Sequence, residues 1–281
     1  MAKFRQLHDL LRRRGFEDDA HWHEPLPVPR RWMELVHGRA YLEAFAQGQL
    51  DAAAQRRIGL PATVPLVRRT WLAVGGTLLT ARLALRHGIA CHLAGGTHHA
   101  FPDHGSGFCI VNDVAVAIRV LLSEGALARV LVVDLDVHQG DGTAWIFAGD
   151  RRVFTFSAHG ATNFPARKQA SDLDLPLPDG LEDDAYLAAV LERLPDLLDQ
   201  IRPGLVFYNA GVDPHRDDRL GRLCLSGQGL RRRDSFVLDA CLRRGIPIAT
   251  VLGGGYDSIE ALVQRHALVF EAAVEGLRRQ S

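Results

Sequence analysis

Short apolar runs alternate along this chain with longer stretches in which apolar residues recur every three or four positions. The short runs predict buried strands, and the longer periodic stretches predict amphipathic helices. Strands are expected at 89–94, 129–135, 152–157, 205–209 and 246–252, and helices at 3–14, 31–49, 65–87, 111–124, from 143, 184–201, 227–243 and 258–278. The segments 21–30, which contains three prolines, and 159–180, which lacks periodicity, are expected to be loops.

The regular alternation of strand and helix sets the expected fold class. Each predicted strand is apolar along its whole length, which indicates burial on both faces beneath helices. We therefore expect an α/β protein with a mainly parallel central sheet in a three-layer αβα arrangement. Because no repeat, low-complexity segment or linker interrupts the pattern, we expect residues 1–281 to form a single domain.

Composition narrows the classes of function. Lysine plus arginine and aspartate plus glutamate balance at 33 each, so direct binding to nucleic acid is not expected. Two short arginine runs, 12–14 and 231–233, are expected to lie on solvated helix faces. No apolar stretch reaches the ~20 residues that a bilayer requires. The four cysteines form no CxxC pair, which favours a reduced, cytoplasmic location.

The run at 133–142, VDLDVHQGDG, carries the strongest chemical signal. Side chains alternate along a strand, so Asp134, Asp136 and His138 are expected on one side, where the chain turns through two glycines. Carboxylates and an imidazole together are ligands for a catalytic divalent metal such as zinc or iron. The alternatives are an acidic surface loop, or carboxylates that cap the following helix.

Three other predicted strands also end in polar or glycine-rich sequence: Gly95-Gly96-Thr97-His98-His99-Ala100, Asn209 to His215, and Gly253-Gly254-Gly255-Tyr256-Asp257. Loops at the carboxyl ends of parallel strands converge in space, which predicts one shared site. Taken singly, the histidines could be polar filler, the glycines a phosphate-binding helix entrance, and the tyrosine a core aromatic.

In combination and order, these motifs resemble the histone deacetylase superfamily, which includes acetylpolyamine amidohydrolases and acetoin-utilisation proteins. The resemblance extends over nearly the whole chain. It also includes Gly107-Phe108-Cys109 with Asn112-Asp113, and Ala210-Gly211-Val212-Asp213. The stretches 101–107, 163–169 and 213–215 are most similar to the class IV, bacterial-type branch.

The resemblance implies a catalytic metal centre formed by Asp136, His138 and Asp213. This set leaves a position open for water and substrate, as a catalytic zinc site requires, and it accepts Fe²⁺ as well as Zn²⁺. A structural K⁺ ion is implied beside it. The ligands matching that second site are main-chain carbonyls of Asp134, His138 and Ala158, with side chains of Asp136 and Ser157.

The remaining implied residues carry out acid–base chemistry and bind the substrate. His98 and His99 would form an acid–base dyad, paired with Asp134 and Asp141 respectively. Tyr256 would donate its hydroxyl to the developing oxyanion. Gly107, Phe108 and Phe164 resemble the walls of an acyl-lysine tunnel, although ordinary core packing is an alternative for Phe108.

The expected function is therefore metal-dependent hydrolysis of an Nε-acyl-lysine amide. Alternatives are an acetylpolyamine or small-metabolite amidohydrolase, and a non-catalytic acyl-lysine binding module, although no dyad histidine, metal ligand or tyrosine is lost. An arginase-type ureohydrolase needs further carboxylates, where this chain has Gly140 and Gly211. Relatives usually place a strand and a loop before the first helix; either the start is truncated or misassigned, or an edge strand has been lost.

Overall fold

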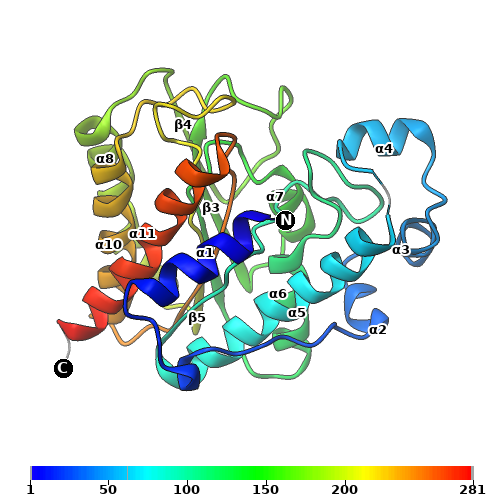
Figure 1. Cartoon of the computed structure of the whole chain (residues 1–281), viewed down its shortest axis with the longest axis horizontal. Coiled ribbons are helices and arrows are strands. Elements are labelled where there is room, and N and C mark those ends of the chain that lie inside the picture. Colours follow the sequence, from blue (N-terminus) through cyan, green and yellow to red (C-terminus); the bar gives the residue numbers. More distant parts are fainter. Residues whose placement is uncertain (1, 62, 280–281) are drawn as a thin grey trace.

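The computed structural model describes residues 2–61 and 63–279, and the six strands found in them form one parallel sheet (Figure 1). The spatial order is β1-β6-β5-β2-β3-β4. The strands are β1 (Ile89–Cys91), β2 (Val130–Asp134), β3 (Val153–Gly160), β4 (Leu173–Leu177), β5 (Leu205–Asn209) and β6 (Ile248–Val251). Because every neighbouring pair is parallel, the carboxyl ends of all these strands lie along one edge of the sheet.

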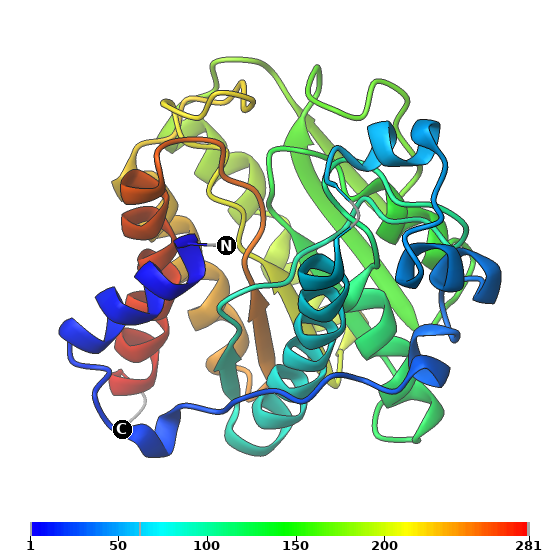
Figure 2. The same ribbon diagram turned by 45° about the vertical axis from the view of Figure 1, so that its right-hand side comes forward.

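Helices cover both faces of this sheet, as the apolar strands predict (Figure 2). One face carries α1 (Ala2–Arg13), α8 (Asp183–Leu191), α9 (Leu194–Ile201), α10 (Gly227–Leu242) and α11 (Ile259–Arg278). The other carries α2 (Arg30–Met33), α3 (Arg39–Ala46), α4 (Ala52–Ile58), α5 (Val64–His87), α6 (Asp113–Ser123) and α7 (Asp141–Phe147). A short 3₁₀ turn, η1, spans Asp19–His21.

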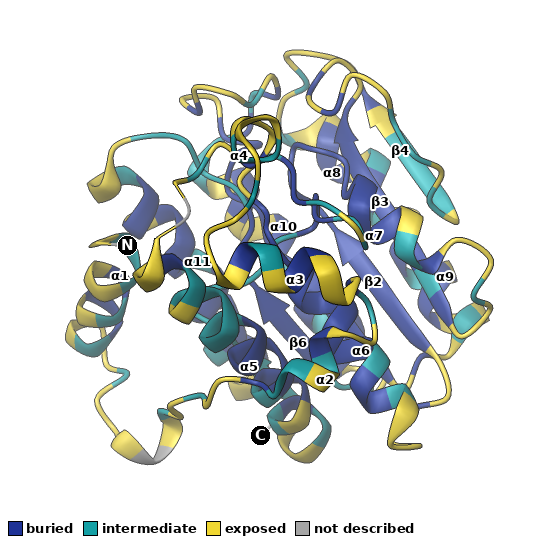
Figure 3. Cartoon of the chain, turned by 90° about the vertical axis from the view of Figure 1, so that its right-hand side faces the viewer, coloured by how far each residue is buried: buried dark blue, intermediate teal, exposed yellow. Residues whose placement is uncertain are grey.

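Strand alternation divides the core into two apolar clusters. In β2, Leu131 and Val133 pack towards α10 and α11, whereas Val130 and Val132 pack towards α5 and α6. All four side chains are buried, and Figure 3 shows the central strands enclosed between the helix layers. The three-layer αβα fold expected from the sequence is therefore confirmed.

Two of the expected helices are interrupted. The segment 31–49 forms α2 and α3 separated by turns, and the separate helix α4 was not predicted. The segment 184–201 forms α8 and α9, and α9 restarts with Pro195 in its first turn. Proline at that position lacks only an N–H that a helix start leaves unpaired, so it favours a new helix there.

The two edges of the sheet also differ from the expectation. The segment 159–180, expected to be a loop, contains strand β4, which pairs with β3. The strand expected at 89–94 is shorter, and β1 is half-buried because it pairs only with β6. None of the helices in the described ranges is long and apolar enough to cross a bilayer.

The expectation for the arginine run 231–233 is wrong at one position. Arg231 and Arg232 lie on the exposed side of α10, but Arg233 is completely buried. Its side chain is the largest among the fully buried residues of the described chain.

Candidate active site

The register of three neighbouring strands brings polar side chains together at the carboxyl edge of the sheet. Asp134 of β2 pairs with Asn209 of β5 on one side and Ser157 of β3 on the other. The strand ends at Asp134, but alternation continues through the next four residues. Leu135 and Val137 enter the apolar core, while Asp136 and His138 are buried on the polar side.

Asp136, His138 and Asp213 form one compact buried group. Their potential ligand atoms all lie within 4.8 Å of one another. His138 Nδ1 is 3.0 Å from Asp136 Oδ1 and 3.1 Å from Asp213 Oδ2. Among the described residues, Asp136 Oδ2 has no hydrogen-bond partner, as expected for an oxygen reserved for a cation. Two carboxylates and an imidazole around one point therefore fit a divalent metal.

The electrostatics of this group show how strongly its charges interact. Burial and the nearby Asp213 raise the pKa of Asp136 to about 6. Burial also opposes ionisation of Asp213, but His138 and the Val137 N–H lower its pKa to about 2. Burial opposes the charge on His138, yet its two carboxylate partners raise its pKa to about 10. The two carboxylates thus favour the charged form of the imidazole that lies between them.

The glycine run before Tyr256 permits close packing against this group. Gly254 has φ +29°, and a Cβ there would lie 1.8 Å from Asp213 Oδ2. A Cβ on Gly253 would lie 2.6 Å from Asp136 Oδ2. Any side chain at Gly254 would consequently displace a candidate metal ligand.

Two buried histidine–aspartate pairs lie beside the acidic group. His98 Nδ1 is 2.7 Å from Asp134 Oδ2, and His99 Nδ1 is 2.6 Å from Asp141 Oδ1. The two imidazole centroids are 4.1 Å apart. Because the Nδ1 atoms face carboxylates, the Nε2 atoms are the ones placed for proton transfer to another molecule. His98 Nε2 lies 3.9 Å from Asp136 Oδ1.

The pKa values of the two histidines shift in opposite directions despite their similar partners. Burial disfavours the charge on His98, but Asp134 and Asp136 outweigh it and raise its pKa to about 9. Burial together with the cationic His98 and His138 holds the pKa of His99 well below its usual value. Adjacent acid–base groups with separated pKa values are typical of a catalytic site.

Tyr256 faces the acidic group across a short gap. Its ring centroid is 5.8 Å from that of His138, with the planes at 86°. The backbone is fixed on both sides: the Tyr256 N–H donates to Asp218 at 2.7 Å, and Arg219 donates to its carbonyl at 2.8 Å. Burial and the nearby Asp213 raise the pKa of Tyr256, so its hydroxyl keeps the proton that it would donate.

Two aromatic rings flank the approach to these residues. Phe164 packs edge-on against His99 with centroids 4.9 Å apart, and Phe108 lies 5.7 Å from Tyr256. Their exposed fractions are 44% and 46%, so Phe108 is not a core residue. Gly107 has φ +51°, and a Cβ there would approach His99 to 2.7 Å. Of the predicted tunnel residues, Gly107 and Phe164 are thus adjacent to the dyad, and Phe108 is adjacent to Tyr256.

The geometry also bears on the ureohydrolase alternative. A Cβ on Gly140 would lie 2.4 Å from Asp134 Oδ2, and one on Gly211 would lie 2.5 Å from the Asp136 Cα. Neither position can hold a carboxylate in this backbone, so the further metal ligands of an arginase-type site are absent from these two places.

The residues expected at the monovalent-cation site also lie near one another. Ser157 and Ala158 are consecutive buried residues of β3, beside the end of β2. The Ser157 hydroxyl lies 2.9 Å from His159 Nδ1.

Two supporting residues, Asn209 and Asp113, belong to motifs noted in the sequence but were given no role there. Asn209 donates to Asp134 at 3.0 Å and lies 3.3 Å from His98 Nδ1. Asp113, the first residue of α6, accepts hydrogen bonds from the Gly96 and Thr97 amides, which precede the two histidines. The signals in the sequence that could have indicated their roles are the position of Asn209 at the end of a strand and that of Asp113 at the start of a helix.

A second set of supports holds the loop that carries Phe108. His37 Nδ1 lies 2.9 Å from the Phe101 carbonyl, and its Nε2 accepts from the Asn112 N–H at 2.9 Å. Tyr41 donates to the Ile110 carbonyl at 2.8 Å. Burial lowers the pKa of His37 to about 4, so the imidazole is neutral at neutral pH.

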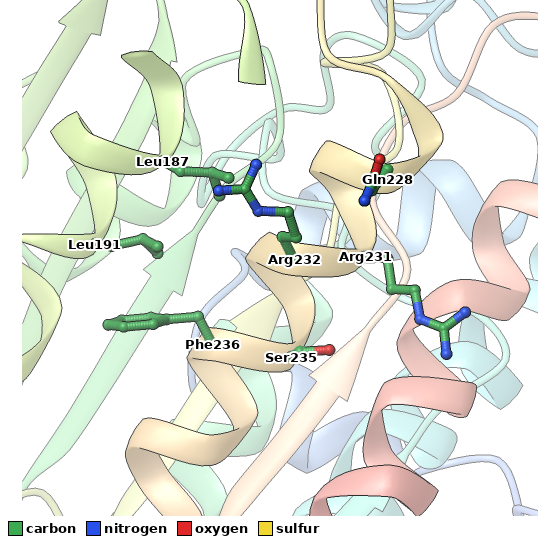
Figure 4. A pocket seen from close by; sticks show the side chains of 7 residues that line it. All are labelled: Leu187, Leu191, Gln228, Arg231, Arg232, Ser235 and Phe236. Carbon is green, nitrogen blue, oxygen red and sulfur yellow. The ribbon is translucent and has the colours of Figure 1, made fainter. Parts of the chain in front are cut away.

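A surface hollow of about 460 Å³ lies elsewhere, between α8 and α10 (Figure 4). Its walls include Leu187, Leu191 and Phe236. The Arg232 side chain extends towards α8 and that of Arg231 towards α11. It contains none of the candidate catalytic residues. The acidic group, the dyad and Tyr256 therefore remain the site that the fold assembles.

Comparison with known proteins identifies the family of this chain. The histone deacetylase domain matches residues 1–273. The chain is 56% identical to an uncharacterised protein of Picosynechococcus, over 97% of this chain and 91% of that protein. It is 30% identical to histone deacetylase 2 of Arabidopsis thaliana, over 95% of this chain and 70% of that protein. It is 32% identical to the acetoin utilization protein AcuC of Staphylococcus aureus, over 86% of this chain and 68% of that protein.

A solved structure extends the comparison to the fold. The crystal structure of the HDA15 HD domain superposes with a TM-score of 0.81 at 22% identity, covering 99% of this chain and 86% of that chain. The architecture is thus the α/β arginase/deacetylase fold. The chain belongs to the histone deacetylase family. Family and fold together suggest a hydrolase, a metal-dependent deacetylase or deacylase.

Proposed function

We propose that this protein is a zinc-dependent deacylase that hydrolyses the amide of an Nε-acyl-lysine. One observation carries the proposal: two buried histidine–aspartate pairs adjoin a buried Asp-His-Asp group. A binding module would need a pocket for the acyl group but no such set of proton-transfer groups, so this observation favours catalysis.

The acidic group and the dyad would divide the chemistry between them. A divalent ion held by Asp136, His138 and Asp213 would polarise the amide carbonyl and make a water molecule easier to deprotonate. His98 and His99 would take the proton from water at Nε2 and deliver it to the leaving amine. Asp134 and Asp141 fix the opposite ring nitrogens and so set the tautomers.

Tyr256 and the two phenylalanines would position the substrate. The Tyr256 hydroxyl would donate to the carbonyl oxygen as negative charge develops there. Phe108 and Phe164 would flank the aliphatic stem of an acyl-lysine, which is apolar and presents no charge beside the rings. A structural K⁺ ion would be held by Asp134, Asp136, His138, Ser157 and Ala158, as expected from the sequence.

The test is an assay of the purified protein on fluorogenic acetyl-lysine, longer acyl-lysine and acetylpolyamine substrates. Each is measured before chelation, after chelation, and after return of Zn²⁺ or Fe²⁺. Chelator-sensitive turnover of acyl-lysine that zinc restores is the expected result. Preferred turnover of acetylpolyamines would assign the alternative substrate class, and metal uptake without turnover of any acylated amine would contradict a catalytic role.

The cellular setting is part of the proposal. The four cysteines are free in the structure, which suits a reducing compartment, and we propose that the protein acts in the cytoplasm. Fractionation of the source cells, followed by detection of the protein, tests this. Recovery outside the cytoplasmic fraction would contradict it.

A further inference from the structure

Behind the acidic group, one buried arginine connects the two segments that supply its carboxylates. Arg233 of α10 is 0% exposed. Its Nη1 donates to the Leu135 carbonyl at 3.1 Å and to the Gly211 carbonyl at 2.8 Å. Leu135 directly precedes Asp136, and Gly211 lies two residues before Asp213. A single nitrogen therefore ties both carboxylate-bearing loops to one helix.

The guanidinium is held in place by two further buried groups. Arg233 Nε donates to Asp234 Oδ1 at 2.9 Å, and the Tyr208 hydroxyl donates to the same oxygen at 2.5 Å. Tyr208 lies in β5, one residue before Asn209. Burial opposes the charge on Arg233, but Asp234 and the tyrosines outweigh it and raise its pKa, so the donors are always present.

From this geometry we propose that Arg233 is a positioning residue for the metal centre. The loop carrying Asp136 follows β2, and the loop carrying Asp213 follows β5. Arg233 fixes the distance between these two loops. The inference rests on the metal centre of the proposed function. Beyond that function, the affinity and geometry of the metal centre depend on Arg233, although Arg233 makes no hydrogen bond to Asp136, His138 or Asp213.

The planar fork of arginine suits this task. Arg233 reaches two carbonyls through one nitrogen while another donates to a carboxylate, a geometry that the compact ammonium of lysine does not reproduce. Loss of groups that orient metal ligands commonly weakens metal affinity by ~10–100-fold. A merely structural arginine would instead lower stability without changing the metal site of the folded protein.

The experiment compares Arg233→Lys with Arg119→Lys in the full chain. Arg119 is the matched control because it also pairs with a carboxylate, Asp150, and donates to a backbone carbonyl, that of Ile146 at 3.1 Å. Zinc affinity is measured by chelator competition, the ligand geometry by the visible spectrum of the Co²⁺-loaded protein, and folding by urea unfolding of the metal-free protein.

We expect Arg233→Lys to fold, to bind zinc ~10–100-fold more weakly, and to change the Co²⁺ spectrum. Arg119→Lys should match the wild type in zinc affinity and spectrum. A folded Arg233→Lys variant with wild-type affinity and spectrum would overturn the proposal, as would equal losses in both variants. A wild-type protein that takes up no zinc would instead overturn the metal centre itself.

A second variant covers the case in which Arg233→Lys does not fold. Tyr208→Phe removes only the hydroxyl that holds Asp234, which in turn holds the guanidinium. It should weaken zinc binding in the same direction but by less than Arg233→Lys. Wild-type zinc affinity and an unchanged Co²⁺ spectrum in folded Tyr208→Phe would then count against the proposal.

Discussion

Two regions of the candidate site are held together in opposite ways. In the acidic group of Asp136, His138 and Asp213, buried charges converge, and one carboxylate oxygen has no partner among the described residues. In the loop 101–112, which carries Phe108, neutral side chains of His37 and Tyr41 bind backbone groups. The first region thus consists of interacting buried charges, whereas the second is held by neutral hydrogen bonds from two side chains outside the loop.

Function and stability are therefore expected to depend on different parts of the site. Buried like charges cost free energy unless a cation or proton lies between them, so removing one should damage function more than folding. Buried neutral hydrogen bonds carry no such penalty, so removing them should damage folding more than chemistry.

The largest expected effect is loss of the metal centre in Asp136→Asn. The variant keeps the shape of the side chain but removes one of two buried carboxylates, so metal content and deacylase activity should fall to background. The metal-free variant should unfold at no lower urea concentration than the metal-free wild type. Elemental analysis, activity assays and urea unfolding measure these three quantities. A metal-free yet fully active variant would contradict a metal-dependent role for the acidic group.

The next effect is expected at Tyr256→Phe. Loss of one oxyanion donor typically lowers kcat by ~10²–10³-fold. Metal content and unfolding should remain those of the wild type, because the backbone of Tyr256 rather than its hydroxyl contacts Asp218 and Arg219. Steady-state kinetics on the best substrate provide the measurement. A rate within twofold of the wild type would remove Tyr256 from the mechanism.

In the second region, His37→Leu should act mainly on stability. The substitution fills much of the imidazole volume but leaves the Phe101 carbonyl and the Asn112 N–H without their partner. Each buried unsatisfied group costs about 1–3 kcal/mol, so the free energy of unfolding should fall by about 2–6 kcal/mol. Urea unfolding measures it, and Arg119→Lys serves as a folded control. Unchanged stability would show that the two hydrogen bonds of the His37 imidazole do not stabilise the fold.

The smallest effect is a difference between the wild type and His37→Leu in how the free energy of unfolding depends on pH. The pKa of His37 is lowered to about 4 in the folded state, below the ordinary 6.5, so the unfolded chain binds a proton that the folded chain does not. Stability from this group is present above pH 6.5 and is lost as the pH falls towards 4. Between pH 7 and pH 5 the wild type should lose about 2 kcal/mol more than His37→Leu. Equal losses would contradict a buried neutral His37.

Two members of the acidic group, Asp136 and His138, could be anticipated because they are close together in the sequence. Asp134, Asp136 and His138 alternate directly after an apolar strand, so strand geometry alone places them on one side. The convergence of strand ends predicted that the segment containing Asp213 lies in the same site, but the role of Asp213 as a metal ligand came only from the resemblance. The order of the strands was not predictable either, since parallel crossovers leave several orders open.

Two misses have physical reasons. Strand β4 contains Asp174 and Pro176 and lies at an edge, so it lacks the continuous apolar character of a central strand. Arg233 was grouped with two exposed neighbours, although helical spacing places it on the buried face with Leu230 and Val237. In a helix, Arg233 follows Leu230 by three residues and precedes Val237 by four, so it lies on the same face as both. This spacing indicates that only Arg233 of the run points towards the core.

The two edges of the sheet also bear on how the protein behaves at high concentration. An open strand edge offers unpaired backbone groups to other molecules and is a common starting point for aggregation. Here β1 is only three residues long, and β4 contains the exposed Pro176, which has no N–H to donate. Both edges are thus poor templates for a strand from another chain, which protects a sheet whose central strands are almost wholly apolar.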